Sequence, residues 1–328
     1  MNLKFWKGKN VLITGYEGFV GSWLSKFLLR TEARIFGLDI KTHRKETILS
    51  KEDLNRIGIT KGSVENFKLV LEIIKKNKID IVFHLAAKSI VGDCLRNPQK
   101  ALKTNVEGTW NVLEACRQAA CVQTVVIASS DKAYGEHKKL PYREDTPLQG
   151  SHPYDVSKSC SDLIAQMYHH TYKLPVVITR CGNIYGPGDF NFSRIVPDAI
   201  RCAILNKTFI IRSDGKFTRD YIFVEDVVNG YIMLAEKAEK QNLFGQAFNF
   251  SNEEPLSVIT IVRKIYEISG KKPDYRVLNE TQHEIKDQYL SSRKAREILK
   301  WKVSHSLRNS LEKTYKWYAS YFENSKRR

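Results

Sequence analysis

The amino-acid sequence predicts an α/β fold, built on a doubly wound parallel sheet with a smaller α/β lobe beside it. Between residues 10 and 180, short β-rich runs alternate with segments of helical apolar spacing, so that each connection runs strand, helix, strand. A Gly-x-x-Gly-x-x-Gly pattern follows the first run, and an acidic residue ends the second. These features are typical of the Rossmann fold, whose parallel strands all end at the edge of the sheet where ligands bind.

Length and composition narrow the class of protein. The chain has 328 residues, of which 42% are hydrophobic and 27% charged, enough for a packed core in one large domain or two modest ones. No apolar run reaches the ~20 residues that cross a bilayer. Residues 1–9 hold neither an apolar signal core nor a cleavage site, which predicts a cytoplasmic protein without a membrane role. The six cysteines lack metal-like spacing, so we expect reduced thiols and no metal site.

The net charge of +17 bears on the expected partners. The lysines are spread along the chain and form no basic block with interleaved aromatic residues, so nucleic acid is not the expected ligand. A lysine-rich surface accounts for most of this charge. A positive cleft would also attract small anionic ligands such as nucleotides.

The glycine pattern predicts a phosphate-binding turn. Gly15, Gly18 and Gly21 stand between a β-rich run, residues 10–14, and a helical segment, residues 22–29. Glycines allow a tight turn and let the backbone approach a pyrophosphate, while the N-terminus of the following helix offers N–H groups to that anion. The strand before, the helix after and the acid on the next strand together make the pattern specific for a dinucleotide.

That acid is Asp39, which ends the run 33–39 and lies 18 residues beyond the last glycine. Its carboxylate would accept hydrogen bonds from the adenosine ribose and repel a 2′-phosphate, which favours NAD over NADP. Lys41 and Arg44 weaken this discrimination, because either side chain could reach a phosphate. The alternative for Asp39 is an ordinary turn acid at the end of a strand.

Two later segments are expected to touch the same dinucleotide. Ser63 and Val64 lie in a predicted loop, residues 62–66, placed to contact the adenine. Ala86 and Ala87 end the β-rich run 79–87, where their small side chains would let the cofactor ribose lie against the chain.

A cluster of reactive residues follows the predicted strand 124–128. Ser130, Asp131 and Lys132 would stand at its carboxyl end, where open α/β sheets place their sites. Tyr154 and Lys158 are four residues apart and share one face of a helix. An ammonium group close to a phenol lowers the phenol pKa toward neutrality, and such a tyrosine can take a proton from an alcohol while hydride leaves the same carbon. The plainer alternatives are an exposed helical pair and a strand-end ion pair.

The rest of the chain predicts a second lobe woven from separated segments. We assign residues 1–182 and about 218–250 to the dinucleotide-binding domain, and residues 183–217 and about 251–328 to a substrate-binding lobe. Residues 41–61 have no clear assignment. Further strands are expected at 175–180, 209–212 and 247–250, a glycine-rich loop at 181–188, and helices at 67–76, 101–120, 154–172, 195–205, 227–237, 256–270 and 292–322.

Together the motifs resemble the extended short-chain dehydrogenase/reductases that act on nucleotide sugars, the NAD-dependent epimerase/dehydratase family. The resemblance covers nearly the whole chain and rests on Thr14-Gly15-x-x-Gly18-Phe19-x-Gly21, His84-x-Ala86-Ala87, Tyr154-x-x-x-Lys158, Arg180-x-x-Asn183-x-Tyr185-Gly186-Pro187 and Arg219-Asp220-Tyr221-x-x-Val224-x-Asp226. Within the family, the chain is similar to CDP-glucose 4,6-dehydratases at Phe5-Trp6-x-Gly8-Lys9, Gly21-Ser22-Trp23-Leu24 and Ser130-Asp131-Lys132. The stretch Arg219-Asp220-Tyr221 departs from that subgroup and looks like the wider family.

The resemblance implies an NAD-dependent lyase that converts CDP-glucose to CDP-4-keto-6-deoxyglucose. Tyr154 would take the C4 hydroxyl proton while a hydride passes to NAD, with Lys158 holding the nicotinamide ribose and Ser130 bonding the C4 oxygen. Asp131, held neutral, would donate a proton to the departing C6 hydroxyl, after which the hydride returns to C6. Lys132 would be either the C5 base, if burial deprotonates it, or an electrostatic stabiliser of the enolate.

The resemblance also implies a set of contacts and a homodimer that pairs the helices around residues 102–117 and 157–172. Cofactor contacts are expected at Gly15, Gly18, Phe19, Val20, Gly21, Asp39, Ser63, Val64, Leu85, Ala86, Ala87, Tyr154, Lys158 and Cys181. Substrate contacts are expected at Ser130, Asn183, Arg194, Val196, Arg212 and Arg219. The alternatives are a nucleotide-sugar 4-epimerase or decarboxylase, and a catalytically silent nucleotide-binding or scaffold protein. Asp131 argues against the epimerase, whereas the nucleobase, the sugar and the downstream pathway stay open.

Overall fold

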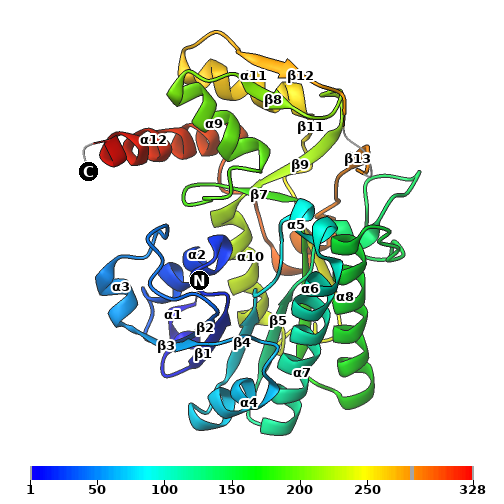
Figure 1. Cartoon of the computed structure of the whole chain (residues 1–328). Coiled ribbons are helices and arrows are strands. Elements are labelled where there is room, and N and C mark those ends of the chain that lie inside the picture. Colours follow the sequence, from blue (N-terminus) through cyan, green and yellow to red (C-terminus); the bar gives the residue numbers. More distant parts are fainter. Residues whose placement is uncertain (1, 281–283, 327–328) are drawn as a thin grey trace.

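A computed structural model describes residues 2–280 and 284–326 and confirms the predicted α/β fold. Figure 1 shows a larger part around a central sheet and a smaller part, with α9, α11 and α12, above it. The central sheet has seven strands in the order β10-β6-β5-β4-β1-β2-β3, and every pair is parallel. The winding reverses between β1 and β4, and sheets of this kind bind their ligands beside that point.

The strands of the central sheet are short, and side chains from both of their faces are buried. Alternate residues of β1 show this, because Val11 and Ile13 join one hydrophobic cluster and Leu12 joins another. The strands span Asn10–Thr14 (β1), Arg34–Asp39 (β2), Ile57–Lys61 (β3), Ile81–His84 (β4), Thr124–Ala128 (β5), Val176–Cys181 (β6) and Ala247–Phe250 (β10).

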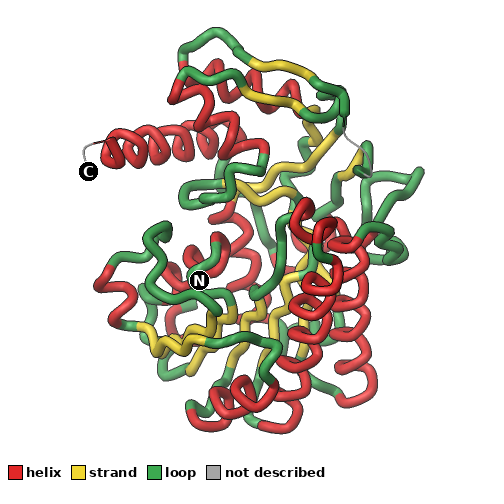
Figure 2. The backbone as a smooth tube through the Cα atoms, viewed as in Figure 1, coloured by secondary structure: helices red, strands yellow, loops and turns green. Residues whose placement is uncertain are grey.

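Helices cover both faces of this sheet, as a doubly wound fold requires (Figure 2). One hydrophobic cluster packs α2 (Phe19–Leu28) and α10 (Val224–Lys237) against the sheet. The other packs α4 (Phe67–Lys76), α7 (Gly108–Ala119) and α8 (Pro153–Tyr172). The two clusters lie on opposite sides of the strands and hold the carboxyl ends of β1, β4 and β5 in one row.

Several connections differ from the predicted elements. The unassigned stretch 41–61 contains α3 (Lys51–Asn55) as well as β3. The helix expected at 101–120 is confirmed as a continuous helical stretch, which consists of α6 (Pro98–Leu102), a π-helical turn (Lys103–Glu107) and α7. The helix expected at 292–322 is broken, because a π-helical turn (Ala295–Leu299) is followed by Lys300, whose left-handed φ of +57° cannot continue a helix. Other short elements are α1 (Leu3–Trp6), α5 (Val91–Arg96) and a 3-10 helix (Asp131–Tyr134).

The smaller part holds two further sheets. β9 lies in the middle of one, between β11 and β13, and also pairs with β7, while β8 and β12 form the other. We expected residues 218–250 in the dinucleotide-binding domain, yet β9 pairs in the smaller sheet; the domain boundaries stay a prediction. The elements span Asn183–Tyr185 (β7), Ile195–Leu205 (α9), Phe209–Ile211 (β8), Thr218–Phe223 (β9), Pro255–Ser257 (β11), Val258–Ser269 (α11), Tyr275–Val277 (β12), Asp287–Gln288 (β13) and Leu307–Lys326 (α12).

A loop after β7, residues 186–193, joins the smaller part to the larger one. The indole N–H of Trp23 on α2 donates to the Pro187 carbonyl oxygen over 2.7 Å. From the other side, the Tyr318 hydroxyl on α12 donates to the Asp189 carbonyl oxygen. The first half of the loop is therefore held from two sides, by α2 of the larger part and by α12 of the smaller part.

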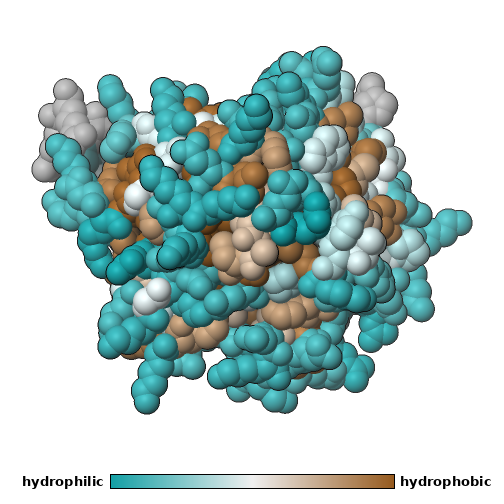
Figure 3. All heavy atoms as spheres, turned by 90° about the horizontal axis from the view of Figure 1, so that it is seen from below, coloured by the Kyte–Doolittle hydropathy of each residue, from teal (hydrophilic) through white to brown (hydrophobic). Residues whose placement is uncertain are grey.

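The surface is largely hydrophilic on the lower face, with apolar areas between the polar side chains (Figure 3). No helix among residues 2–280 and 284–326 is long and apolar enough to cross a membrane. All six cysteines are free thiols. No group of three or more His, Cys, Asp or Glu side chains in the described residues is arranged to hold a metal ion.

Candidate active site

The glycine turn after β1 forms a backbone cradle. Gly15 has a φ of +73°, and a Cβ on it would lie 3.0 Å from the backbone nitrogen of Ala86. A Cβ on Gly21 would lie 2.0 Å from the Gly15 carbonyl oxygen, so a side chain there would clash. Gly18 immediately precedes α2, whose first-turn N–H groups lack helical partners. These glycines let the turn pack tightly against itself and against the segment after β4, as the predicted pyrophosphate-binding turn requires.

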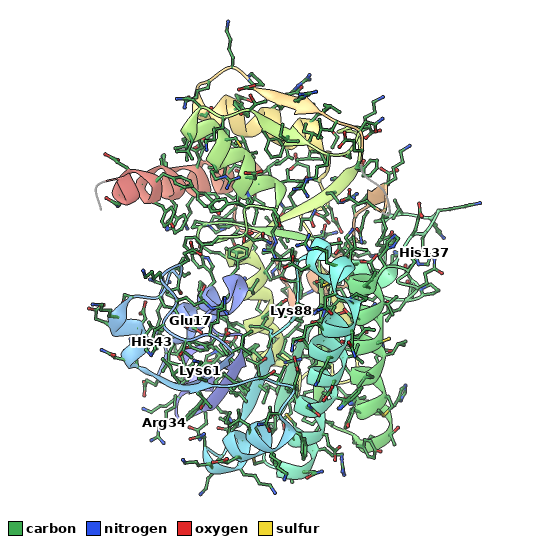
Figure 4. The ribbon with its side chains drawn as sticks, in the orientation of Figure 1. Glu17, Arg34, His43, Lys61, Lys88 and His137 are labelled. Atoms are coloured by element: carbon green, nitrogen blue, oxygen red, sulfur yellow. The ribbon has the colours of Figure 1, made fainter. Side chains whose placement is uncertain are left out.

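Asp39 ends β2 beside this turn and is almost fully buried. Its Oδ1 accepts the Arg44 Nη2–H over 2.7 Å and the Lys41 N–H over 3.1 Å. The Arg44 N–H in turn donates to Glu17 Oε1 over 3.1 Å. In Figure 4, Glu17 lies near α2 with His43 beside it, on the side of the sheet that carries β2 and β3. The acid is thus in place for an adenosine ribose, with a cation next to it.

The segment after β4 is held by side chains from two other elements. Thr14 Oγ1 accepts the N–H groups of Leu85 and Ala86, each over 3.2 Å. Asn105, from the π-helical turn, accepts the Lys88 N–H over 2.7 Å and donates to the Lys88 carbonyl oxygen over 3.0 Å. Figure 4 shows Lys88 near the middle of the molecule, below α5. This segment therefore forms a fixed wall opposite the glycine turn.

His84 supports that wall from below and is not a reactive group. Its Nδ1 lies 2.8 Å from Thr14 Oγ1, and its Nε2 lies 3.1 Å from Thr109 Oγ1. Burial lowers the pKa of His84 to about 3, so the ring is neutral.

The remaining predicted cofactor contacts lie at the same carboxyl edge of the sheet. Val64 is buried and packs against Gly108, where a Cβ would lie only 2.5 Å from Val64 Cγ2. The set comprises Phe19 and Val20 in the first turn of α2, Ser63 and Val64 after β3, Ala87 after β4, and Cys181 at the end of β6.

Ser130, Asp131 and Lys132 stand at the end of β5, as predicted. Ser130 caps the 3-10 helix: its Oγ accepts the Lys132 N–H over 3.2 Å and donates to Asp131 Oδ1 over 3.0 Å. Burial raises the pKa of the Asp131 carboxyl, although the Lys132 charge opposes the rise. Burial lowers the pKa of the Lys132 amine. Both shifts favour neutral groups, an acid that can donate and an amine that can accept.

Tyr154 and Lys158 lie on the first turns of α8, which begins with Pro153. Lys158 is buried, and its Nζ donates to the Ala128 carbonyl oxygen over 2.8 Å. Burial raises the pKa of the Tyr154 phenol, and the hydrogen bond with Ser130 opposes the rise. The predicted lowering of that pKa by Lys158 is therefore wrong for this structure. Burial lowers the pKa of Lys158 to about 8, so the amine still mostly carries its proton at neutral pH.

A row of polar side chains runs across the smaller sheet above this site. Asn183 pairs with Tyr221 and Gln288 pairs with Arg219 in parallel register, so these four side chains share one face of the sheet. Arg219 forms an ion pair with Glu284 over 3.2 Å. The Tyr221 hydroxyl and both amide atoms of Gln288 are buried without a partner among the described residues. Buried polar atoms of this kind are costly unless a ligand or water binds them.

The other predicted substrate residues are dispersed. Arg194 caps α9 and donates to Asp189 Oδ2 over 2.9 Å and to Ser89 Oγ over 3.3 Å. Val196 is buried in the main hydrophobic cluster. Arg212 is exposed after β8, and no contact among the described residues joins its side chain to the rest of the site.

Four residues near the site were not predicted from the sequence. Tyr221 lies inside a motif that we used, but its unpartnered hydroxyl depends on packing, and Gln288 carries no local signal at all. Asp155 directly follows Tyr154 and is 3% exposed, and an acid in the first turn of a buried helix was the available signal. Asp220 is buried too, and its Oδ2 accepts hydrogen bonds from Ser251 Oγ and the Leu290 N–H.

Comparisons with known proteins agree with this geometry. The GDP-mannose 4,6 dehydratase family matches residues 12–314. CDP-glucose 4,6-dehydratase from Salmonella typhimurium is 30% identical, over 97% of this chain and 92% of the relative. UDP-glucuronate 4-epimerase from Thermodesulfobacterium geofontis is 28% identical, over 93% of this chain and 95% of the relative. The crystal structure of dTDP-glucose 4,6-dehydratase from Bacillus anthracis in complex with NAD has a TM-score of 0.85 at 26% identity, and covers 96% of this chain and 98% of that chain.

Proposed function

The chain belongs to the GDP-mannose 4,6-dehydratase family, and we propose that it is an NAD-dependent nucleotide-sugar 4,6-dehydratase acting on CDP-glucose. The observation that carries this proposal is the buried Asp131, one residue after Ser130 at the end of β5. A carboxyl whose pKa is raised by burial can stay protonated at neutral pH and donate to a leaving hydroxyl. A 4-epimerase, which expels no water, has no need of such an acid.

NAD is the cofactor of this family, and the residues of the chain fit it. The glycine turn would hold the pyrophosphate, Asp39 the adenosine ribose and Lys158 the nicotinamide ribose. When bound, NAD supplies hydride chemistry: it accepts a hydride from C4 of the sugar and returns it to C6.

The protein's own groups would move the protons. Tyr154 would take the proton of the C4 hydroxyl in its phenolate form, which the hydrogen bond with Ser130 and the positive nicotinamide ring of bound NAD would favour against the effect of burial; Ser130 would also hold the C4 oxygen. The resulting C4 ketone acidifies C5–H. A base takes the C5 proton, the electron pair forms the C5–C6 double bond, and the C6 hydroxyl leaves as water with a proton from Asp131. When hydride is returned to C6, the same base would give a proton back to C5, which completes the 4-keto-6-deoxy sugar. Lys132, whose pKa burial lowers, is placed either to be that base or to stabilise the enolate.

The polar row on the smaller sheet would bind the nucleotide sugar. Arg219 is the cation in this row, and we propose that it binds the diphosphate together with Asn183. The unpartnered Tyr221 hydroxyl and Gln288 amide supply further donors and acceptors beside it. Arg194 at the start of α9 and Val196 are proposed to border the nucleoside, with Arg212 as an outer support.

A 4-epimerase is the second candidate, because a UDP-glucuronate 4-epimerase is nearly as similar as the dehydratase relative. A mass-spectrometric screen of CDP-, dTDP-, GDP- and UDP-sugars with the NAD-loaded protein separates the two. We expect CDP-glucose to lose the mass of one water. An unchanged mass with altered retention would mark epimerisation, loss of carbon dioxide from a uronate would mark a decarboxylase, and no product from any sugar would favour a silent nucleotide-binding protein.

A homodimer is proposed from an exposed apolar face on α7 and α8. Trp110, Leu163 and Met167 on these helices have 42–52% of their surfaces exposed, and Leu102 at the end of α6 and Tyr172 at the end of α8 are exposed as well. Figure 1 shows α7 and α8 side by side on the right of the central sheet. Pairing across a two-fold axis would bury this face as a bundle of four helices. The cytoplasmic location stays a prediction.

A further inference from the structure

Lys132 belongs to a buried cluster of ionisable groups that the proposed mechanism does not fully use. Asp131, Asp155 and Arg219 are each 3% exposed, although charged side chains seldom lie so deep without a specific arrangement. Arg219 has an anionic partner in Glu284. Asp131 has an assigned role as the acid. Asp155 has no assigned role in the mechanism, although it is the residue that directly follows Tyr154.

The backbone fixes Asp155 against the 3-10 helix that carries Lys132. The Ser159 hydroxyl on α8 donates to the Ala133 carbonyl oxygen over 2.7 Å and also lies 3.1 Å from the Asp155 carbonyl oxygen. The same hydroxyl accepts the Gly150 N–H over 3.1 Å. A Cβ on Gly150 would lie 2.4 Å from the Asp155 carbonyl carbon, so the chain packs closely there. Ser159 thus joins the first turns of α8 to the residue that follows Lys132.

We propose that Asp155 is a positioning residue for Lys132. The carboxylate of Asp155 governs how readily the Lys132 amine holds a proton during the elimination step. This inference rests on the proposed function for its catalytic meaning. It does not depend on whether Lys132 is the C5 base or the stabiliser of the enolate, because both roles require a controlled proton on the same nitrogen.

The charges around both groups support this assignment. The charges acting on Asp155 are those of Lys132, His152, Asp131 and Arg219, with Lys132 the largest. Those acting on Lys132 are Arg219, which disfavours its proton, and Asp131, Asp155 and Glu284, which favour it. Burial raises the pKa of Asp155 to about 6, so the carboxyl is still mostly ionised at neutral pH. Of the two buried carboxyls, Asp131 must be neutral to act as an acid, which leaves Asp155 as the buried anion for a protonated Lys132.

This assignment predicts the direction in which the pKa of Lys132 changes when the Asp155 charge is removed. If Lys132 takes the C5 proton, the new ammonium group appears beside an existing carboxylate, and that charge pair lowers the barrier. Removing the Asp155 charge makes the Lys132 ammonium less favourable. The pKa of Lys132 should therefore fall, and every pH-dependent property of that amine should move to lower pH.

The first test titrates Lys132 directly in the NAD-bound protein by NMR with carbon-13 at the lysine ε position. The Lys132 signal is the one that disappears in Lys132→Met. In Asp155→Asn we expect its titration midpoint to fall by about one pH unit, which corresponds to about 1.4 kcal/mol of lost charge interaction. Asp155→Glu, which keeps the charge, should restore most of the wild-type midpoint. Asp155→Ser is a second neutral variant, for use if the Asn variant unfolds.

Asp145→Asn is the matched control, since it removes a carboxylate from an exposed position and should leave the Lys132 midpoint unchanged. A midpoint that stays the same, or rises, in both neutral Asp155 variants overturns the inference. The second test follows solvent deuterium exchange at C5 of CDP-glucose against pH. The part of this pH profile that is lost in Lys132→Met should move to lower pH in Asp155→Asn, by the same amount as the NMR midpoint. If the wild type converts no nucleotide sugar while the NMR midpoint still falls, the proposed function fails and the Asp155–Lys132 coupling stands.

Discussion

Arg44 Nη2 donates a hydrogen bond to Asp39 Oδ1 over 2.7 Å, so the acid at the end of β2 carries its own cation. One carboxylate oxygen is thereby occupied, and the other is left to accept a ribose hydroxyl. The pair suits a ribose diol, because the carboxylate repels a 2′-phosphate while Arg44 is held by Asp39. If Asp39 were removed, Arg44 would be free to bind that phosphate.

The first prediction concerns cofactor choice. Wild-type protein, denatured after purification, should release NAD as its dominant nucleotide, as chromatography would show. Asp39→Ala should lose at least about tenfold of its preference for NAD over NADP, since a hydrogen bond to a charged group contributes roughly 1.5–3 kcal/mol. Glu46→Ala removes an exposed acid from the same loop and should change nothing. Finding mainly NADP in the wild type would contradict the role of Asp39.

Local patterns predicted most of the central sheet and its cofactor edge. Strand 124–128 and helices 67–76 and 195–205 agree with the structure to the residue. The pattern of apolar residues that predicts each of them lies entirely within the element itself. The glycine turn was predictable for the same reason: strand, turn and helix are contiguous in the chain.

Features that depend on distant contacts were not predictable. Gln288 joins the polar row only because β13 pairs with β9, and a strand of two residues is too short to be predicted from a local sequence pattern. The direction of Lys158 is a similar case. Helical spacing places it on the face of Tyr154, but the Ala128 carbonyl oxygen at the end of β5 attracts its amine instead. The spacing of residues along a helix determines the face on which a side chain lies, whereas tertiary packing determines which atom that side chain contacts.

The second prediction concerns assembly. Wild-type protein should be a dimer by light scattering, and Met167→Glu should convert it to a monomer, because a charge in the middle of an apolar interface between helices costs several kcal/mol. Ile210→Glu is the control: it introduces the same charge at an apolar side chain of β8 that is equally exposed, 42% in each case. A monomer at every concentration of wild type would exclude this interface.

The third prediction concerns stability against pH through Asp220. Burial raises its pKa to about 7 from an ordinary 3.8, so the folded protein holds this proton more tightly than the unfolded chain. The carboxyl therefore stabilises the fold at low pH, and the stabilisation is lost as the pH rises through about 7. Between about pH 5.5 and 8 it should remove roughly 2 kcal/mol from the free energy of unfolding.

Urea unfolding at several pH values checks this behaviour. Asp220→Asn, which cannot titrate, should show a pH dependence smaller by about that amount, whereas the exposed Asp145→Asn should match the wild type. An Asn variant with the full wild-type dependence would show that Asp220 is not the group responsible.

The fourth prediction separates the two roles left open for Lys132. The substitution Lys132→Met keeps the length of the side chain and removes its nitrogen. If Lys132 is the C5 base, exchange of the C5 hydrogen with solvent deuterium should vanish in this variant. If Lys132 stabilises the enolate, exchange should slow but persist, since another group still removes the proton. NMR of the recovered sugar nucleotide measures the exchange. Oxidation at C4, which is measured by the absorbance of NADH, should continue in either case.

The fifth prediction separates oxidation from elimination, because the two steps use different residues. Tyr154→Phe removes the group that takes the C4 hydroxyl proton, so no NADH should form with CDP-glucose. Asp131→Asn keeps the size and hydrogen bonding of the side chain but provides no acidic proton for the C6 hydroxyl. It should still oxidise C4, and NADH should accumulate on the enzyme as its near-ultraviolet absorbance rises.

Formation of the 6-deoxy product by Asp131→Asn should fall by ~100- to 10,000-fold, the usual contribution of a general acid. The matched control is Asp214→Asn, a carboxylate after β8 that should leave both steps unchanged. NADH that accumulates while product fails to appear is a signature that general loss of structure does not give, since an unfolded enzyme would oxidise nothing. Full dehydration by Asp131→Asn would refute the assignment of Asp131, because Asp131 is the carboxylic acid that the 3-10 helix after β5 places beside Ser130.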